Sequence, residues 1–316
     1  MRVLPKLQEL LDKIELRKQA LTAVGHVVNQ SNTREVFNII SRSYMLPDTL
    51  ALLTLATLDD VVYNGSFPVP LRIYLPEIQN AQTQVAVYLH GGGHMCGSIS
   101  AYDAQVRLLV KHTGYIIVSI DYRLSPESPY PFGLEDCKAA IRGLAAVFRR
   151  RSLNWNNRGL TLIGDSAGAA LSASLIMDKE FVVVEQIMRQ VLIYPSLDYT
   201  LSLPSVTEFA TGHLIEKSKI VWYFDSYFQN NEDRRKASPL YGEFYAKMPA
   251  TMVIVAGFDP LRDEGVLYYN NVLQVGARAE LLQLDNVVHG YLMLESLCPE
   301  ECQQTYQEIS KFLAAS

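Results

Sequence analysis

The sequence of 316 residues contains few cysteines and no long hydrophobic run. Of its 4 cysteines, only Cys298 and Cys302 lie close together, and no second pair of cysteines or histidines accompanies them. Neither a disulfide scaffold nor a zinc site is therefore expected. The longest uncharged and mostly apolar stretch near the middle of the chain is Ala167–Met177. It falls well short of the ~20 residues that span a bilayer, so we expect no transmembrane segment.

The chain also lacks a large excess of charge of either sign. Lys and Arg number 28 against 33 Asp and Glu, which gives a net charge of -5, and the basic residues are scattered along the chain. A nucleic-acid surface needs basic residues gathered in a patch, so no nucleic-acid partner is expected. Charges also interrupt the first apolar positions, whereas a signal peptide needs an apolar run of roughly 7–15 residues there. We expect a cytoplasmic protein and leave its oligomeric state open, a dimer included.

Apolar residues are abundant enough for a large core, since 49% of the residues are hydrophobic and 19% are charged. After a hairpin over residues 61–75, β-type runs alternate with stretches of helical periodicity. The β-type runs are 85–89, 115–120, 160–163, 191–194, 252–256 and 280–284, and the helical stretches include 101–112, 134–150, 169–179, 266–275 and 300–313. This alternation predicts an α/β fold with a mostly parallel sheet and helices on both faces. We expect residues 1–316 to form a single domain.

The first fifty residues differ from the rest of the chain. Leu4, Leu7, Leu11 and Ile14 follow helical spacing, and no β-rich run appears before about Val61. Residues 1–50 are therefore predicted to form helices outside the sheet. Such a segment either covers the active site as a cap or serves as a structural extension.

A short glycine-bracketed motif gives the first sign of chemistry. Gly164-Asp165-Ser166-Ala167-Gly168 follows the β-type run 160–163 and opens a helix. Gly-x-Ser-x-Gly in this setting is typical of a nucleophile elbow, in which Ser166 projects above the sheet and the N–H of Ala167 points into the site. The alternative is an ordinary helix start with Ser166 as its N-cap.

A second glycine motif follows an earlier strand. His90-Gly91-Gly92-Gly93 comes directly after residues 85–89. Three consecutive glycines cost conformational entropy on folding, which suggests that their backbone itself is needed. We assign Gly91, Gly92 and Gly93, together with Ala167, to an oxyanion hole, as in lipases and esterases. A flexible turn is the alternative, and a phosphate loop is disfavoured because no Gly-Lys-Ser/Thr follows. His90 is interpreted as a brace for the loop.

Chain order selects the acid and the base. This type of site places the acid and then the histidine after the serine, and only His289 follows the last predicted strand. Asp259 lies beyond the run 252–256, between Ser166 and His289, and is the predicted acid. Asp259 followed by Pro260 is also a good start for a helix, so Asp263 remains the alternative.

Taken together, these motifs resemble the hormone-sensitive-lipase-like branch of the α/β-hydrolases, which includes bacterial acetyl esterases and carboxylesterases. A further block, Asp121-Tyr122-Arg123-Leu124-Ser125-Pro126-Glu127, supports the resemblance, which runs from Val85 to the C-terminus. The resemblance implies hydrolysis of small carboxylic esters with short to medium acyl chains through a Ser-His-Asp acyl-enzyme, without a cofactor or metal.

The resemblance also has departures. His94 stands where the family usually has a bulky aromatic residue, Ser125 replaces a common alanine, and Cys96 lies close by. We assign His94 and Asp165 to substrate binding on the same resemblance. An amidase or deacetylase with the same triad, an acyltransferase and a non-catalytic ligand-binding homologue remain alternatives, although His289 weighs against the last.

Overall fold

The computed structural model describes residues 2–25, 27–156, 159–181, 183 and 186–315. Its strands form one eight-stranded sheet in the order β1-β2-β4-β3-β5-β6-β7-β8. The strands are β1 (Thr57–Asn64), β2 (Phe67–Tyr74), β3 (Val85–Leu89), β4 (Ile116–Ile120), β5 (Leu160–Asp165), β6 (Ile187–Ile193), β7 (Ala250–Phe258) and β8 (Ala279–Val288). β1 and β2 form the predicted hairpin, β2 pairs antiparallel with β4, and every other neighbouring pair is parallel. The prediction of a mostly parallel sheet is confirmed.

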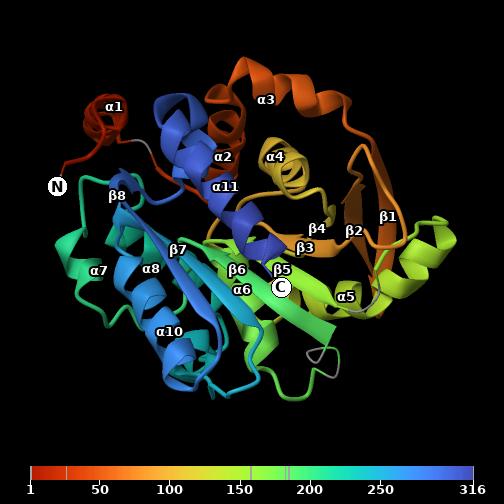
Figure 1. Cartoon of the computed structure of the whole chain (residues 1–316). Coiled ribbons are helices and arrows are strands. Elements are labelled where there is room, and N and C mark those ends of the chain that lie inside the picture. Colours follow the sequence, from red (N-terminus) through yellow and green to blue (C-terminus); the bar gives the residue numbers. More distant parts are fainter. Residues whose placement is uncertain (1, 26, 157–158, 182, 184–185, 316) are drawn as a thin grey trace.

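Helices cover both faces of the sheet (Figure 1). α5 (Phe132–Arg150), α6 (Ala167–Met177) and α10 (Arg262–Gln274) pack on one face, and α4 (Asp103–Thr113) and α11 (Pro299–Ala314) pack on the other. The central strands β3, β4 and β5 are buried along their whole length. Parallel strands covered on both faces read as continuous apolar runs, which is why the sequence revealed them.

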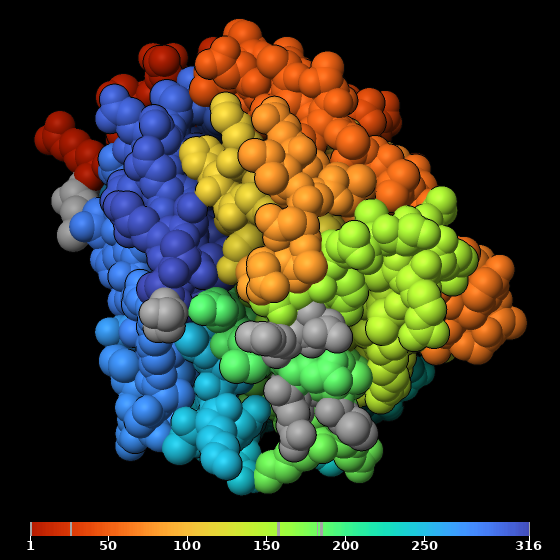
Figure 2. All heavy atoms as spheres, turned by 45° about the vertical axis from the view of Figure 1, so that its right-hand side comes forward, coloured from red at the N-terminus to blue at the C-terminus, as the bar shows by residue number. Residues whose placement is uncertain are grey.

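The first fifty residues form helices, as predicted: α1 (Pro5–Ala23), α2 (Gln30–Ser43) and α3 (Pro47–Ala51). α1 buries Leu7 and Leu11 in the same core as α4 and α11. α2 begins with a reciprocal cap, in which the side chains of Asn29 and Asn32 each accept from the other residue's backbone N–H. Figure 2 shows these N-terminal residues, in red and orange, along the upper edge of the molecule.

The segment between β6 and β7 contains helices that the sequence analysis did not predict. These are α7 (Ser205–Glu208), α8 (Lys217–Tyr227) and α9 (Arg234–Ala237). α8 is rich in aromatic residues, which are mediocre helix formers and obscure the helical period. Its buried face, which includes Tyr223, Phe224 and Tyr227, packs against Met95 and Cys96 in a separate apolar cluster. No helix in the described ranges is both long and apolar enough to cross a membrane.

Candidate active site

The predicted site residues gather at one edge of the sheet. β5 ends at Asp165, β7 at Phe258 and β8 at Val288, so Ser166, Asp259 and His289 each follow the carboxyl end of a parallel strand. β3 ends at Leu89 and leads into the glycine loop at the same edge. Ligand sites of open α/β sheets form at this edge, because the loops that leave the parallel strands converge there.

Ser166 occupies a strained turn between β5 and α6. Its φ of 51° and ψ of -118° lie outside the regions that non-glycine residues prefer. The turn also brings backbones close together: a Cβ on Gly168 would overlap the carbonyl of Leu89, and one on Gly164 would overlap the carbonyl of Gly168. The N–H of Ser166 donates to the carbonyl of Ile193 at 2.8 Å, which holds the turn against β6. Such strain is common at functional sites.

Ser166, His289 and Asp259 form a continuous hydrogen-bonded row. Nε2 of His289 lies 2.9 Å from Oγ of Ser166, and Nδ1 of His289 lies 2.8 Å from Oδ2 of Asp259. Asp259 is fully buried, and its other oxygen accepts from the N–H of Leu261 at 2.8 Å. An ionised carboxylate at Nδ1 favours a proton on that nitrogen and leaves the Nε2 lone pair facing Ser166. A histidine in this position can take the proton of the serine hydroxyl, which is what a general base does for a nucleophile.

The glycine loop presents free backbone donors beside this row. Gly92 and Gly93 have φ values of 110° and 63°, which favour glycine, and a Cβ on Gly92 would overlap the carbonyl of Cys96. Among the described residues, neither of their N–H groups donates to an acceptor in the protein. Ala167 is the first residue of α6, so its N–H lacks an intrahelical acceptor. Gly91 is a correction to the predicted set: its N–H donates to Asp165 at 2.7 Å and is not free for an oxyanion.

Asp165 is buried beneath the glycine loop. Its Oδ1 accepts from the hydroxyl of Tyr88 at 2.8 Å and from the N–H of Gly91, and its Oδ2 accepts from the hydroxyl of Tyr102 at 3.0 Å. Burial raises the pKa of this carboxyl to about 6, although the three hydrogen bonds oppose that shift. The predicted substrate contact is not supported for Asp165, because both oxygens are engaged inside the protein.

His94 also faces the protein interior. Its ring stacks on Tyr227 with centroids 3.8 Å apart, and its Nε2 lies 3.1 Å from the hydroxyl of Tyr199. Burial lowers the pKa of His94 to about 3, so the ring is neutral near pH 7. Only 2% of the residue is exposed. A direct substrate contact is therefore not supported for the His94 ring, which shapes the site by supporting the loop that carries it.

His90 braces the glycine loop, in agreement with the prediction. The ring is fully buried and stacks on Tyr122, with centroids 4.4 Å apart, and its Nδ1 lies 2.8 Å from the carbonyl of Gly91. The hydroxyl of Tyr122 donates to the carbonyl of His90 at 2.6 Å. The sequence did not reveal the roles of Tyr88 and Tyr102, which both donate to Asp165. Tyr88 could have been noticed, since it lies inside the apolar strand β3 and a buried hydroxyl needs a hydrogen-bond partner.

No metal centre accompanies these residues in the part of the chain that the structure describes, where no group of three or more His, Cys, Asp or Glu side chains is placed to hold an ion. The buried thiols of Cys298 and Cys302 lie 3.8 Å apart and are free.

A serine on a strand-turn-helix elbow, followed along the chain by an acid and a histidine at later strand ends, defines the α/β-hydrolase class. A family model described as alpha/beta hydrolase fold matches residues 86–293. The chain belongs to this family, in its hormone-sensitive-lipase-like branch.

Individual relatives agree with this placement. Esterase LipI of Mycobacterium tuberculosis is 32% identical over 257 residues, which cover 79% of this chain and 79% of that protein. Ethyl acetate hydrolase of Pseudomonas putida is 27% identical over 308 residues and covers 94% of each chain. A solved hyperthermophilic esterase from the archaeon Pyrobaculum calidifontis has a TM-score of 0.84 and 27% identity, with 99% of this chain and 98% of that chain covered.

The buried carboxyl of Asp165 makes a testable contribution to stability. Its pKa is raised from 3.8 to about 6, so between these values the folded protein binds more protons than the unfolded chain. Asp165 therefore stabilises the folded protein fully below about pH 4. As the pH rises through 6 this contribution, on the order of 3 kcal/mol in the free energy of unfolding, is lost. Asp165→Asn lacks this titration. We expect the difference in free energy of unfolding, wild type minus variant, to fall by that amount between pH 4 and pH 7 in urea titrations. A difference that does not change with pH would contradict the raised pKa.

Proposed function

We propose that this chain is a serine carboxylesterase that hydrolyses short- to medium-chain carboxylic esters through an acyl-enzyme on Ser166. The observation that carries the proposal is the row of two hydrogen bonds from Ser166 through His289 to Asp259. The free N–H groups beside this row and the named esterase relatives support it. The named relatives show that the chain is a carboxylic ester hydrolase. The roles of its individual residues are what we propose.

In the proposed mechanism His289 first acts as a base. It takes the Ser166 proton on Nε2 while Oγ attacks the ester carbonyl carbon, and Asp259 stabilises the imidazolium that forms. The N–H groups of Gly92, Gly93 and Ala167 stabilise the oxyanion, and each donor of this kind is worth roughly 3–4 kcal/mol. His289 then protonates the departing alcohol as the C–O bond breaks. Water repeats the sequence on the acyl-enzyme and releases the acid.

Aromatic side chains restrict the space next to the glycine loop. The ring of Tyr223 on α8 lies against Gly93, so closely that a Cβ there would overlap it. Tyr199, Phe224, Tyr227 and Phe228 fill the volume behind it as a buried cluster. Tightly packed rings leave little room for a long chain, because protein interiors contain few voids. This packing supports the preference for short to medium acyl groups.

Hydrolysis of p-nitrophenyl esters from acetate to laurate, beside a matched p-nitroanilide, tests the proposal. We expect turnover of the esters, highest among the shorter acyl chains, and a much lower rate on the anilide. Folded protein that cleaves the anilide better than the ester would point to an amidase. No turnover of either substrate by folded protein would overturn the enzyme assignment in favour of a ligand-binding homologue.

A further inference from the structure

The glycine loop is held at both of its ends. At its start, the N–H of Gly91 donates to Asp165. At its end, the carbonyl of His94 accepts from the N–H of Ser125 at 2.8 Å and from the Ser125 hydroxyl at 3.0 Å. The next carbonyl, of Met95, accepts from Nε of Arg34 at 2.8 Å. The two free donors, at Gly92 and Gly93, lie between these fixed points.

Arg34 comes from α2 in the N-terminal segment, far from the loop in sequence and outside the residues matched by the family model. Its guanidinium makes a second contact with the same support, donating to the carbonyl of Ser125 at 2.8 Å. It also makes a bidentate ion pair with Glu127, with Nη1 2.8 Å from Oε1 and Nη2 2.7 Å from Oε2. This ion pair lowers the pKa of Glu127 to about 2. A planar guanidinium with several donors in fixed directions suits such multiple contacts.

The position of α2 is fixed independently of Arg34. Its reciprocal Asn29–Asn32 cap sets where the helix begins. One turn beyond Arg34, Phe37 packs on the ring of Tyr102, with centroids 6.0 Å apart, and Tyr102 donates to Asp165. α2 therefore contacts the supports at both ends of the glycine loop, one through Phe37 and the other through Arg34.

We propose that Arg34 is a positioning residue for the oxyanion hole, through which helix α2 of the N-terminal segment holds the Gly92 and Gly93 donors in place. The inference rests on the proposed function. Arg34 contacts no reacting atom in this assignment. It acts by fixing the Met95 carbonyl and, through Ser125, the His94 carbonyl, since preorganised donors stabilise an oxyanion only when they are held in the right geometry.

The test compares Arg34→Met with Arg42→Met in the full-length protein. Arg42 lies in the last turn of the same helix and is exposed, so its replacement removes the same charge without touching the loop. With active sites counted by burst titration, we expect kcat on p-nitrophenyl butyrate to fall about tenfold in Arg34→Met, with KM within about twofold. Arg42→Met should retain the wild-type kcat. An Arg34→Met enzyme that melts at a lower temperature but keeps the kcat of Arg42→Met per active site would overturn the proposal.

Milder variants keep the test decisive if Arg34→Met folds poorly. Arg34→Lys has a single ammonium group in place of the guanidinium, so its kcat should lie between those of Arg34→Met and the wild type. Ser125→Ala loses one of two donors to the His94 carbonyl and should lower kcat a few-fold. Glu127→Gln, which leaves both carbonyl contacts of Arg34 intact, should stay within about twofold of wild type. Wild-type kcat in both Arg34→Lys and Ser125→Ala would contradict the inference.

Labelling of Ser166 by a fluorophosphonate separates this inference from the proposed function. In that reaction the Ser166 Oγ–P bond forms, the P–F bond breaks, and His289 takes the serine proton. The phosphoryl oxygen uses the same N–H donors, so Arg34→Met should label about tenfold more slowly than Arg42→Met. If the wild type labels but hydrolyses no ester, the esterase proposal fails and the labelling ratio still decides the role of Arg34. Equal labelling rates would reject that role.

Discussion

Ser166→Ala is expected to reduce kcat on p-nitrophenyl butyrate by roughly 10⁴- to 10⁶-fold, because it removes the atom that attacks the ester. The oxyanion donors remain in the variant, so a slow residual hydrolysis above the rate in water is expected. Steady-state assays at high enzyme concentration, with the burst of p-nitrophenol as a second readout, measure both effects. The burst should vanish, since no acyl-enzyme forms.

Ser174→Ala provides the matched control. Ser174 lies on α6, the helix that directly follows Ser166, and it is only partly buried. Its replacement should leave kcat within about twofold of wild type, as expected for a partly exposed substitution away from the site. Ser166 would not be the nucleophile if Ser166→Ala kept more than about a tenth of the wild-type kcat while Ser174→Ala, prepared in the same way, kept the wild-type kcat.

Asp259→Asn should lower kcat by about 10⁴-fold with little change in KM. The carboxylate accepts from Nδ1 of His289 at 2.8 Å and also from the N–H of Leu261. Because the Leu261 N–H favours the carbonyl oxygen of the introduced amide, the NH₂ group of that amide would face Nδ1 as a donor. The imidazole would then carry its proton on Nε2 and could not accept one from Ser166. Steady-state kinetics on the ester measure the loss.

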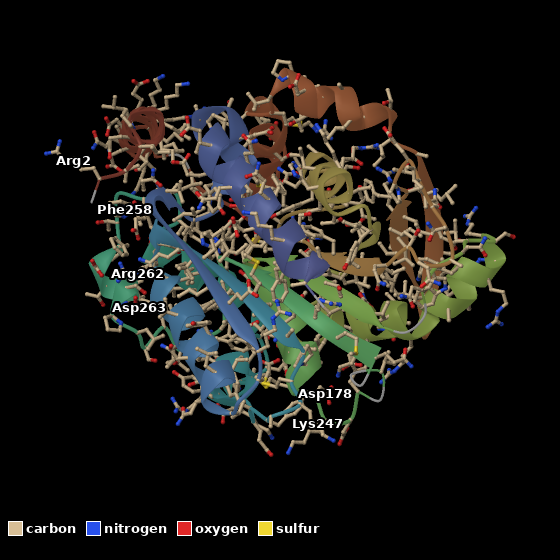
Figure 3. The ribbon with its side chains drawn as sticks, in the orientation of Figure 1. Arg2, Asp178, Lys247, Phe258, Arg262 and Asp263 are labelled. Atoms are coloured by element: carbon tan, nitrogen blue, oxygen red, sulfur yellow. The ribbon has the colours of Figure 1, made fainter. Side chains whose placement is uncertain are left out.

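Asp263→Asn is the informative comparison, since the sequence left Asp263 as the alternative acid. The structure places Asp263 away from His289: its Oδ2 accepts from the N–H of Ser205 at 2.9 Å, and its Oδ1 pairs with Arg262 at 2.9 Å. Figure 3 shows Asp263 and Arg262 close together beside α7. We expect Asp263→Asn to lose less than about tenfold in kcat. A larger loss there than in Asp259→Asn would reverse the assignment of the acid.

The fold and the meeting of Ser166, Asp259 and His289 at one edge of the sheet could be predicted because their signals are local. Strands buried on both faces appear as continuous apolar runs, and the residue that follows such a run lies at the strand end. The elbow around Ser166 and the loop after Leu89 also depend on glycines that are adjacent in the chain. Strand ends were less certain: β8 continues to Val288, well beyond the predicted 280–284, because pairing with β7 extends across an irregularity after Ala256.

The parts of the predicted site that the structure does not support have a common cause, which is that contact partners lie far apart in sequence. Gly91 was assigned to the oxyanion hole and Asp165 to substrate binding, yet each engages the other across 74 positions. His94 was also assigned to the substrate, but its ring packs on Tyr227 from α8, a helix that the sequence did not reveal. No local pattern reports which polar group satisfies a buried donor or acceptor.

By itself, the sequence determined the class of fold, the glycine-dependent turns and which serine, aspartate and histidine follow the ends of parallel strands, because each depends on periodicity or on neighbouring residues. Only the tertiary structure decided which backbone N–H groups are free, that Asp165 supports the loop, and that Arg34 reaches it from the N-terminal segment. These features depend on packing that brings distant segments into contact, where burial forces each polar group to find a partner.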